Sequence, residues 1–204
     1  MAVVKLSTSG LVNFAKYSSM RAGIPLPSLG SYDLLATEIL TSSQASVTFS
    51  SLGDYAADYQ HLQIRATARS TKTGDADDYL HMQFNANATN SYSWHTLNGT
   101  GSTVTSTAAS SLSSIRAGNA TLPGSSATAN AFGGFVIDIL DPFETSKNTT
   151  TRALTGVASS WSYLNLTSGA FYSTDALTEI KLFSIYLNLA QYSRFSLYGL
   201  KASA

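Results

Sequence analysis

The histidines are the side chains best suited to metal binding or acid–base catalysis, and their spacing favours neither. The chain has three of them among its 204 residues, His61, His81 and His95. His61 and His81 occupy the polar positions of two alternating segments, so we expect both on the solvent faces of neighbouring strands. A metal would need a third ligand, and neither an H-x-H pair nor a suitably spaced carboxylate supplies one. We therefore expect no metal and no cofactor.

Carboxylates form two clusters with the composition of a cation site or an acid–base pair: Asp75, Asp77 and Asp78 in one segment, and Asp138, Asp141 and Glu144 in another. Neither cluster has the spacing of an EF-hand, and acids in loops more often accept the hydrogen bonds of turns. Glycoside hydrolysis would need two facing carboxylates, and the strand periodicity places Asp138 and Asp141 on opposite faces. The sequence also lacks a nucleophile elbow and glycine-rich phosphate loops. We expect no catalytic residues and no enzymatic activity.

Aromatic residues near serines are the remaining candidates for binding. Tyr92, Trp94, Trp161 and Tyr163 lie in or beside predicted strands, within a sequence rich in hydroxyl groups. Aromatic rings with polar ends stack on the apolar faces of sugars and also fill protein interfaces. The alternative is that they are half-buried in a core, which we expect for most of the aromatics in this chain. Trp94 and Trp161 are the least typical of a core, so we take these four residues as candidates for glycan contact.

The composition excludes several classes of protein. Charged residues make up 12% of the chain, about half the usual share, and the formal net charge is zero. A general nucleic-acid binder needs clustered lysine and arginine, so we expect no nucleic acid as a partner. The apolar runs are too short for a membrane span, so we expect no membrane insertion, and the first residues lack the pattern of a secretory signal. With 44% hydrophobic residues and no cysteine, the chain favours an ordered domain without disulfides or thiol chemistry.

Strand-like alternation dominates the sequence after residue 36. The segment Gln60–Ser70 is the clearest case, because its even-numbered residues from Leu62 to Ala68 are apolar and the intervening residues are polar. Similar segments occur at 47–49, 79–84, 133–141, 152–159, 163–171, 179–187 and 193–201. We interpret the serine- and threonine-rich stretch 98–114 as a long exposed loop. The pattern predicts an all-β fold, an antiparallel two-sheet sandwich of the jelly-roll-like kind.

The first part of the chain differs from the rest. We divide the sequence into an extended N-terminal arm, residues 1–35, and a β-sandwich domain, residues 36–204. The arm has apolar residues but no partner for them in its own segment, and its prolines hold the residues before them extended. It either covers the domain as a lid or docks to a larger particle or a neighbouring subunit. The candidate docking residues are Leu11, Val12, Phe14, Tyr17, Met20, Ile24, Pro25 and Pro27.

Three segments resemble virion structural proteins of tailed bacteriophages, of the tail-fibre or minor structural protein type. They are Leu122–Asp141, Gln191–Lys201 and the predicted strand pair in Val47–Ser70. The similarity consists of strands and turns and contains no catalytic motif. It implies a non-enzymatic protein located in the virion and displayed on the particle exterior, where an appendage-type module attaches to the host cell surface.

The resemblance also implies partners. They are other virion proteins, further copies of this chain in a homo-oligomer, with a trimer favoured, and a host-surface glycan. The alternative within the same family is a capsid decoration (cement) or head-fibre protein, bound to the shell through its N-terminal arm. A polysaccharide depolymerase and a free-standing lectin are rival interpretations, and the separated carboxylates argue against the first of them.

Overall fold

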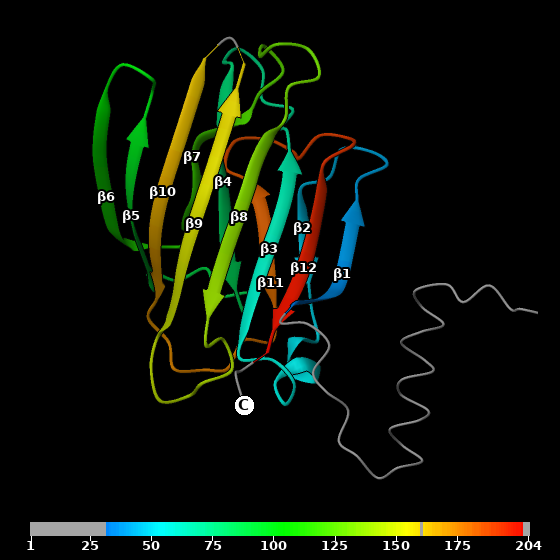
Figure 1. Cartoon of the computed structure of the whole chain (residues 1–204), viewed down its shortest axis with the longest axis vertical. Helices are drawn as coiled ribbons and strands as arrows, with labels where there is room; N and C mark the ends of the chain where they lie inside the picture. Colours follow the sequence, from blue (N-terminus) through cyan, green and yellow to red (C-terminus); the bar gives the residue numbers. More distant parts are fainter. Residues whose placement is uncertain (1–31, 160, 202–204) are drawn as a thin grey trace, which may run out of the picture. The chain divides into compact units, whose positions relative to one another are not determined.

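The computed structural model describes residues 32–159 and 161–201, which are built almost entirely from β-strands (Figure 1). Strands account for 57% of the described residues and helix for 2%, so the expected all-β class is confirmed. Strand β1 (Tyr32–Ile39) begins inside the range that the sequence assigned to the arm, so residues 32–35 belong to the sandwich. The candidate docking residues, from Leu11 to Pro27, lie outside the described residues. No helix in the described part is long and apolar enough to span a membrane.

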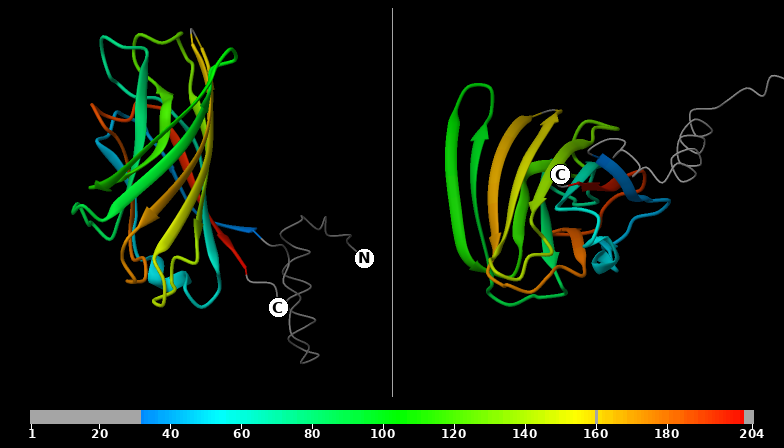
Figure 2. Two further views of the ribbon diagram at one scale, coloured as in Figure 1. Left: turned by 90° about the vertical axis from the view of Figure 1, so that its left-hand side faces the viewer. Right: turned by 60° about the horizontal axis from the view of Figure 1, so that its bottom comes forward.

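Two antiparallel sheets form the domain. Besides β1, the described elements are β2 (Ser46–Phe49), the short 3-10 helix η1 (Leu52–Tyr55), β3 (His61–Ala68), β4 (Asp77–Phe84), β5 (Tyr92–Gly99), β6 (Val104–Leu112), β7 (Ile115–Pro123), β8 (Gly133–Leu140), β9 (Thr149–Ala158), β10 (Ser162–Phe171), β11 (Ile180–Ser184) and β12 (Arg194–Leu200). The larger sheet has the order β1-β12-β3-β8-β9-β10-β5-β6, and the smaller sheet has the order β2-β11-β4-β7. The sheets lie face to face (Figure 2), so the predicted two-sheet sandwich is confirmed.

The core between the sheets contains the apolar residues that the alternation predicts. Leu62 and Ile64 of β3 have no exposed surface, and the same holds for Leu80 and Met82 of β4. Each fully buried aliphatic side chain contributes roughly 1.5–3 kcal/mol to stability. The polar residues between them point to the other face of their strand, because successive side chains of a strand alternate.

The loop predicted at 98–114 is wrong. This stretch contains the end of β5 and the whole of β6. Strand β6 is the outermost strand of the larger sheet, and almost all of its residues are exposed. A strand with solvent on both faces needs no alternation of polar and apolar residues, so its serine, threonine and alanine composition hides it. Strand β7 likewise lies outside the segments that the periodicity identifies as strands.

Strand β10 reverses the usual placement of polar and apolar residues. Asn165 and Thr167 are buried, at 0% and 2% exposure, whereas Leu164 and Leu166 are 60% and 50% exposed. The buried amides bond to one another, because Asn165 Nδ2 donates to Asn98 Oδ1 at 2.9 Å. A buried polar layer is stable only when its groups are paired in this way. The inner face of this part of the sheet is therefore filled by amides and hydroxyls, and its leucines face outward.

Candidate functional site

The structure separates the histidines. His61 lies in β3 of the larger sheet and His81 in β4 of the smaller one, so the expectation of neighbouring strands is wrong. His61 Nδ1 accepts a hydrogen bond from the backbone N–H of Asp141 at 3.0 Å. His95 is exposed on β5. Within 32–159 and 161–201, no three histidine and carboxylate side chains are placed to hold a metal ion.

His81 is buried rather than exposed to solvent, which corrects the sequence-based expectation. Its Nδ1 atom lies 2.7 Å from Ser114 Oγ, and the Phe183 ring packs against it with centroids 5.8 Å apart. Its Nε2 atom has no hydrogen-bond partner among the described residues. Burial, followed by the charge of Arg116, lowers the pKa of His81 to about 3. The imidazole is therefore neutral at pH 7.

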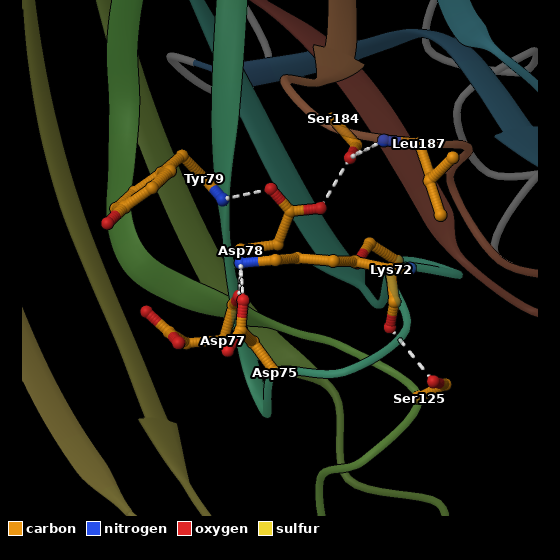
Figure 3. Close-up of polar contacts among 9 residues, drawn as sticks. Lys72, Asp75, Asp77, Asp78, Tyr79, Ser125, Ser184 and Leu187 are labelled. Carbon is orange, nitrogen blue, oxygen red and sulfur yellow. Dashed lines mark hydrogen bonds and ion pairs between the residues drawn. The ribbon is translucent and has the colours of Figure 1, made fainter.

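The acidic residues of the first cluster lie at the start of β4 and in the segment before it (Figure 3). Asp78 is fully buried, and its Oδ2 atom accepts a hydrogen bond from Ser184 Oγ at 2.5 Å. Lys72 lies beside the other two acids. Its Nζ atom is 3.0 Å from Asp75 Oδ2 and donates to the backbone oxygen of Asp77 at 2.8 Å. A cation of the chain itself thus occupies this cluster.

Asp138 and Asp141 each pair with a basic residue of their own. Arg152 Nη2 on β9 lies 2.8 Å from Asp138 Oδ2 on β8. Lys147 Nζ donates to Asp141 Oδ2 at 2.5 Å, and this hydrogen bond is the main reason that the pKa of Asp141 lies below its ordinary value. The hydrogen-bond partners of the two carboxylates are different, so their geometry is that of two surface ion pairs.

The four aromatic candidates for glycan contact lie at opposite ends of the β5–β10 pair. Tyr92 and Trp94 stand at the start of β5, opposite the end of β10, whereas Trp161 and Tyr163 stand at the start of β10. Tyr92 has no exposed surface and Trp94 only 5%. The prediction that these two rings are open to a glycan is therefore wrong, because core packing covers them. Trp161 and Tyr163 are partly exposed, and their contact with glycan stays a prediction.

A cleft of about 310 Å³ contains several residues that the sequence analysis missed. We call it the aromatic cleft and define it by Tyr79, His81, Trp94, Arg116 and Tyr186. These residues come from β4, β5, β7 and the segment after β11, so no local motif predicts the cleft. The guanidinium carbon of Arg116 lies 4.4 Å from the centroid of the Tyr79 ring and 4.3 Å from that of Trp94. Cation–π contacts with both rings stabilise the arginine in this position.

The outer surface of the larger sheet carries a second candidate site. The strand register places Val136, Leu154, Leu166 and Leu97 in one row across β8, β9, β10 and β5, with Leu164 in the next row. These five side chains are between 37% and 60% exposed, and we call them the leucine face. Exposed apolar side chains that adjoin one another in this way are typical of interaction surfaces.

A shallow groove of about 640 Å³ adjoins the leucine face. Gly134 of β8 and Gly156 of β9 are register partners, and the absence of their side chains lowers the surface between Leu154 and the neighbouring strands. Arg65 and Arg194 line the other side of the groove. The groove therefore has one apolar wall and one basic wall.

Comparison with models of known protein families and with curated protein sequences finds no match.

Proposed function

We propose that this protein is a non-enzymatic virion protein of a tailed bacteriophage, displayed on the particle exterior as a tail-fibre or appendage-type module for attachment to the host cell surface. It acts as a homo-oligomer, with a trimer favoured, whose copies meet through the leucine face. The resemblance of three sequence segments to phage structural proteins supports the virion location. The leucine face supports the assembly.

The outward leucines are the observation that carries the assembly proposal. A monomeric protein would be more stable with Leu164 and Leu166 facing the core. The gain would be roughly 1 kcal/mol for each half-exposed leucine that becomes buried. Strand β10 instead buries Asn165 and Thr167 and leaves the leucines in water. This arrangement is favourable when another subunit covers the leucine face, because the leucines then enter an interface and the polar layer stays paired.

A second copy of the chain is the partner that fits this surface best. The side chains of the leucine face are uncharged, so an apolar patch of another copy can cover them without burying a charge. Strand β6 lies beside it and is exposed along nearly its whole length, without a charged residue or a proline to block pairing with another strand. Natural edge strands usually carry such blocking residues unless something covers them.

A trimer is favoured because the sheet has a second apolar patch at its other end. Tyr32, Leu34 and Ile39 of β1 are 47%, 57% and 55% exposed. In a cyclic trimer each interface joins two different patches of the same chain, whereas a two-fold dimer joins one patch to itself. Two distinct apolar patches on one sheet suit the first arrangement.

Light scattering coupled to size-exclusion chromatography tests the assembly. The wild-type chain is expected at three times its mass of 21.6 kDa. The double variant Leu164→Asn, Leu166→Thr is expected to elute as a monomer. The matched control is Leu187→Asn, because Leu187 is 49% exposed but lies after β11, in the segment that follows the smaller sheet. A monomeric wild type, or a double variant that still forms the oligomer, would overturn the assembly proposal.

Imaging of intact particles with an antibody against residues 36–204 tests the location. Label at the tail supports the attachment role. Label spread over the head would replace it with the capsid decoration or head-fibre role, with the N-terminal arm as the docking element. Absence of label from the particle would overturn the virion proposal.

A further inference from the structure

We propose that the aromatic cleft binds a small ligand that carries a carboxylate on a hydroxylated ring, the chemistry of an acidic sugar such as a uronic acid. The carboxylate pairs with Arg116, and the ring lies against Tyr79 and Tyr186. As the host-surface ligand, such a sugar rests on the attachment role proposed above. Binding itself needs only the isolated chain, because one copy supplies all the residues of the cleft.

Arg116 is a partly buried cation without a counter-ion in the described part of the chain. No carboxylate of residues 32–159 and 161–201 forms an ion pair with it. Its Nη1 atom donates to Asn119 Oδ1 at 3.0 Å, while its Nε atom is buried and has no partner. The contacts with Tyr79 and Trp94 engage the π-face of the guanidinium. Its donors lie in the plane of the group, so they remain directed at an acceptor along its edge.

His81, on the neighbouring strand, supplies a second buried nitrogen without a partner. It is the register partner of Arg116 across the β4–β7 pair, and its Nε2 atom is also buried without a partner. The neutral ring can accept a hydrogen bond from Ser114 at Nδ1, which places its own hydrogen on Nε2. Neither nitrogen is open to solvent in the free protein, so a carboxylate reaches them only after side chains of the cleft rearrange. Binding then provides acceptors for two donors that the free protein leaves unpaired.

The number of charges favours a carboxylate over a phosphate. Arg116 is the cation of the cleft that lacks an ion pair, since Lys72, which lies 4.2 Å from the Tyr186 ring centroid, already pairs with Asp75. His81 stays neutral and adds a donor rather than a second charge. A monoanion matches one free cation, whereas phosphate groups are usually bound by several cationic or backbone donors.

The walls of the cleft suit a ring with both apolar and polar edges. Tyr186 is 56% exposed, and its ring centroid lies 6.0 Å from that of Tyr79. Two adjacent tyrosines offer apolar ring faces together with hydroxyl groups, and Ser113 and Ser114 add further polar groups at the edge. Sugars present the same combination of apolar ring faces and hydroxyls.

Fluorescence titration and calorimetry of the full chain test the proposal. The chain has two tryptophans, so the Trp161→Phe variant leaves Trp94, beneath Arg116, as the only reporter. We expect D-galacturonate or D-glucuronate to change its emission with a Kd in the millimolar range. D-galactose and D-glucose at matched ionic strength are expected to bind roughly tenfold more weakly or worse, because they lack the charge-assisted hydrogen bonds.

Two variants locate the site. Arg116→Gln is expected to weaken binding of the acidic sugar at least about tenfold and to remove the preference over the neutral sugar. Arg65→Gln is the matched control, because Arg65 also contacts two tyrosine rings, Tyr32 and Tyr198, but on the outer face of the larger sheet. If Arg116→Gln does not fold, Tyr186→Ala replaces it, since that side chain is largely exposed.

Equal binding of acidic and neutral sugars, or an absence of binding at millimolar concentration, would overturn the carboxylate site. Loss of binding in Arg65→Gln instead of Arg116→Gln would move the ligand to the outer face and would also overturn it. Because the purified chain is titrated, these outcomes are independent of where the protein lies on a particle, so a failure here and a failure of the virion proposal are distinguishable.

Discussion

At pH 7 the imidazole of His81 carries no charge, because β4 places it in a buried space beside the cationic Arg116. In the unfolded chain a histidine has an ordinary pKa near 6.5, whereas burial lowers the pKa of His81 to about 3 in the folded protein. The unfolded state therefore takes up a proton between these two values and the folded state does not. The stabilising contribution of neutral His81 is therefore fully present above about pH 6.5, and it is lost as the pH falls toward 3.

The expected loss is roughly 1 kcal/mol for each pH unit below about 6.5. It is measured by urea denaturation at about pH 7, 5.5 and 4.5. His81→Gln is expected to flatten this dependence, and His95→Gln, which removes an exposed histidine, is the control. The pKa of Asp141 is also lowered, chiefly by its hydrogen bond from Lys147, and its contribution is lost below about pH 4, outside this window. Equal slopes for the wild type and His81→Gln would contradict the assignment.

Two adjacent glycines of β8 are expected to differ sharply in how much stability the same substitution costs. A β-carbon on Gly133 would overlap the backbone oxygen of Thr121 and come within 3.1 Å of the Phe135 ring. On Gly134 its nearest neighbour would be the Gly156 oxygen at 3.9 Å. Gly133→Ala is expected to lower the free energy of unfolding by about 3 kcal/mol, and Gly134→Ala to change it by less than about 0.5 kcal/mol. Chemical denaturation of the two variants compares them, and similar values would contradict the packing described here.

At the scale of the strand, β10 shows what periodicity can and cannot predict. Its sequence alternates, so a strand is predictable over 163–171. Periodicity does not decide which of the two sets of residues faces the core. Here the polar set is inside, because Asn119 of β7 in the opposite sheet donates its backbone N–H to Asn165 Oδ1 at 3.1 Å and its side chain bonds to Asn98. Such partners come from distant segments and leave no local signal.

Strands β3, β4 and β8 are the opposite case. The apolar set that the alternation assigns to the core, such as Ile64 of β3 and Ile137 of β8, is buried there. The residues of the aromatic cleft are predictable from the sequence only in part. Tyr79 and His81 could be placed on one face of a strand from the sequence. Arg116 reaches them through the β4–β7 pairing, and Trp94 joins them from β5 of the opposite sheet. Composition and spacing thus predict the sandwich, while the site depends on its topology.

One substitution on each face of β10 tests whether the polar side chains form the inner layer. Asn165→Ala removes an acceptor for the Asn119 N–H and a donor to Asn98, so it is expected to cost about 2–4 kcal/mol of unfolding free energy. Leu166→Thr is expected to change the stability of the monomer by less than about 0.5 kcal/mol and to weaken assembly. Denaturation at low protein concentration separates the two effects. A larger cost for Leu166→Thr than for Asn165→Ala would contradict the inverted arrangement.

At the scale of the whole chain, all described strands lie within residues 32–200 and pair with one another in the two sheets. Removal of residues 1–31 is therefore expected to leave a folded domain whose melting temperature changes by only a few degrees. Circular dichroism measures this. If the arm docks to the particle, the same truncated chain should fail to join virions. A truncated chain that is unfolded would show that the arm is part of the domain, and one that joins particles normally would show that the arm is not the docking element.

The position of β12 determines when the domain is able to fold. This strand is the last described one in the chain, yet it pairs with β1 on one side and with β3 on the other. During synthesis on the ribosome, β1 and β3 therefore lack their shared neighbour until β12, which ends at Leu200, has been made. Pairings between residues so distant in sequence slow folding, and the unpaired edge of β3 is open to wrong partners during that time. We therefore expect the yield of folded protein to depend on chaperones that cover the unpaired strand edges during this interval.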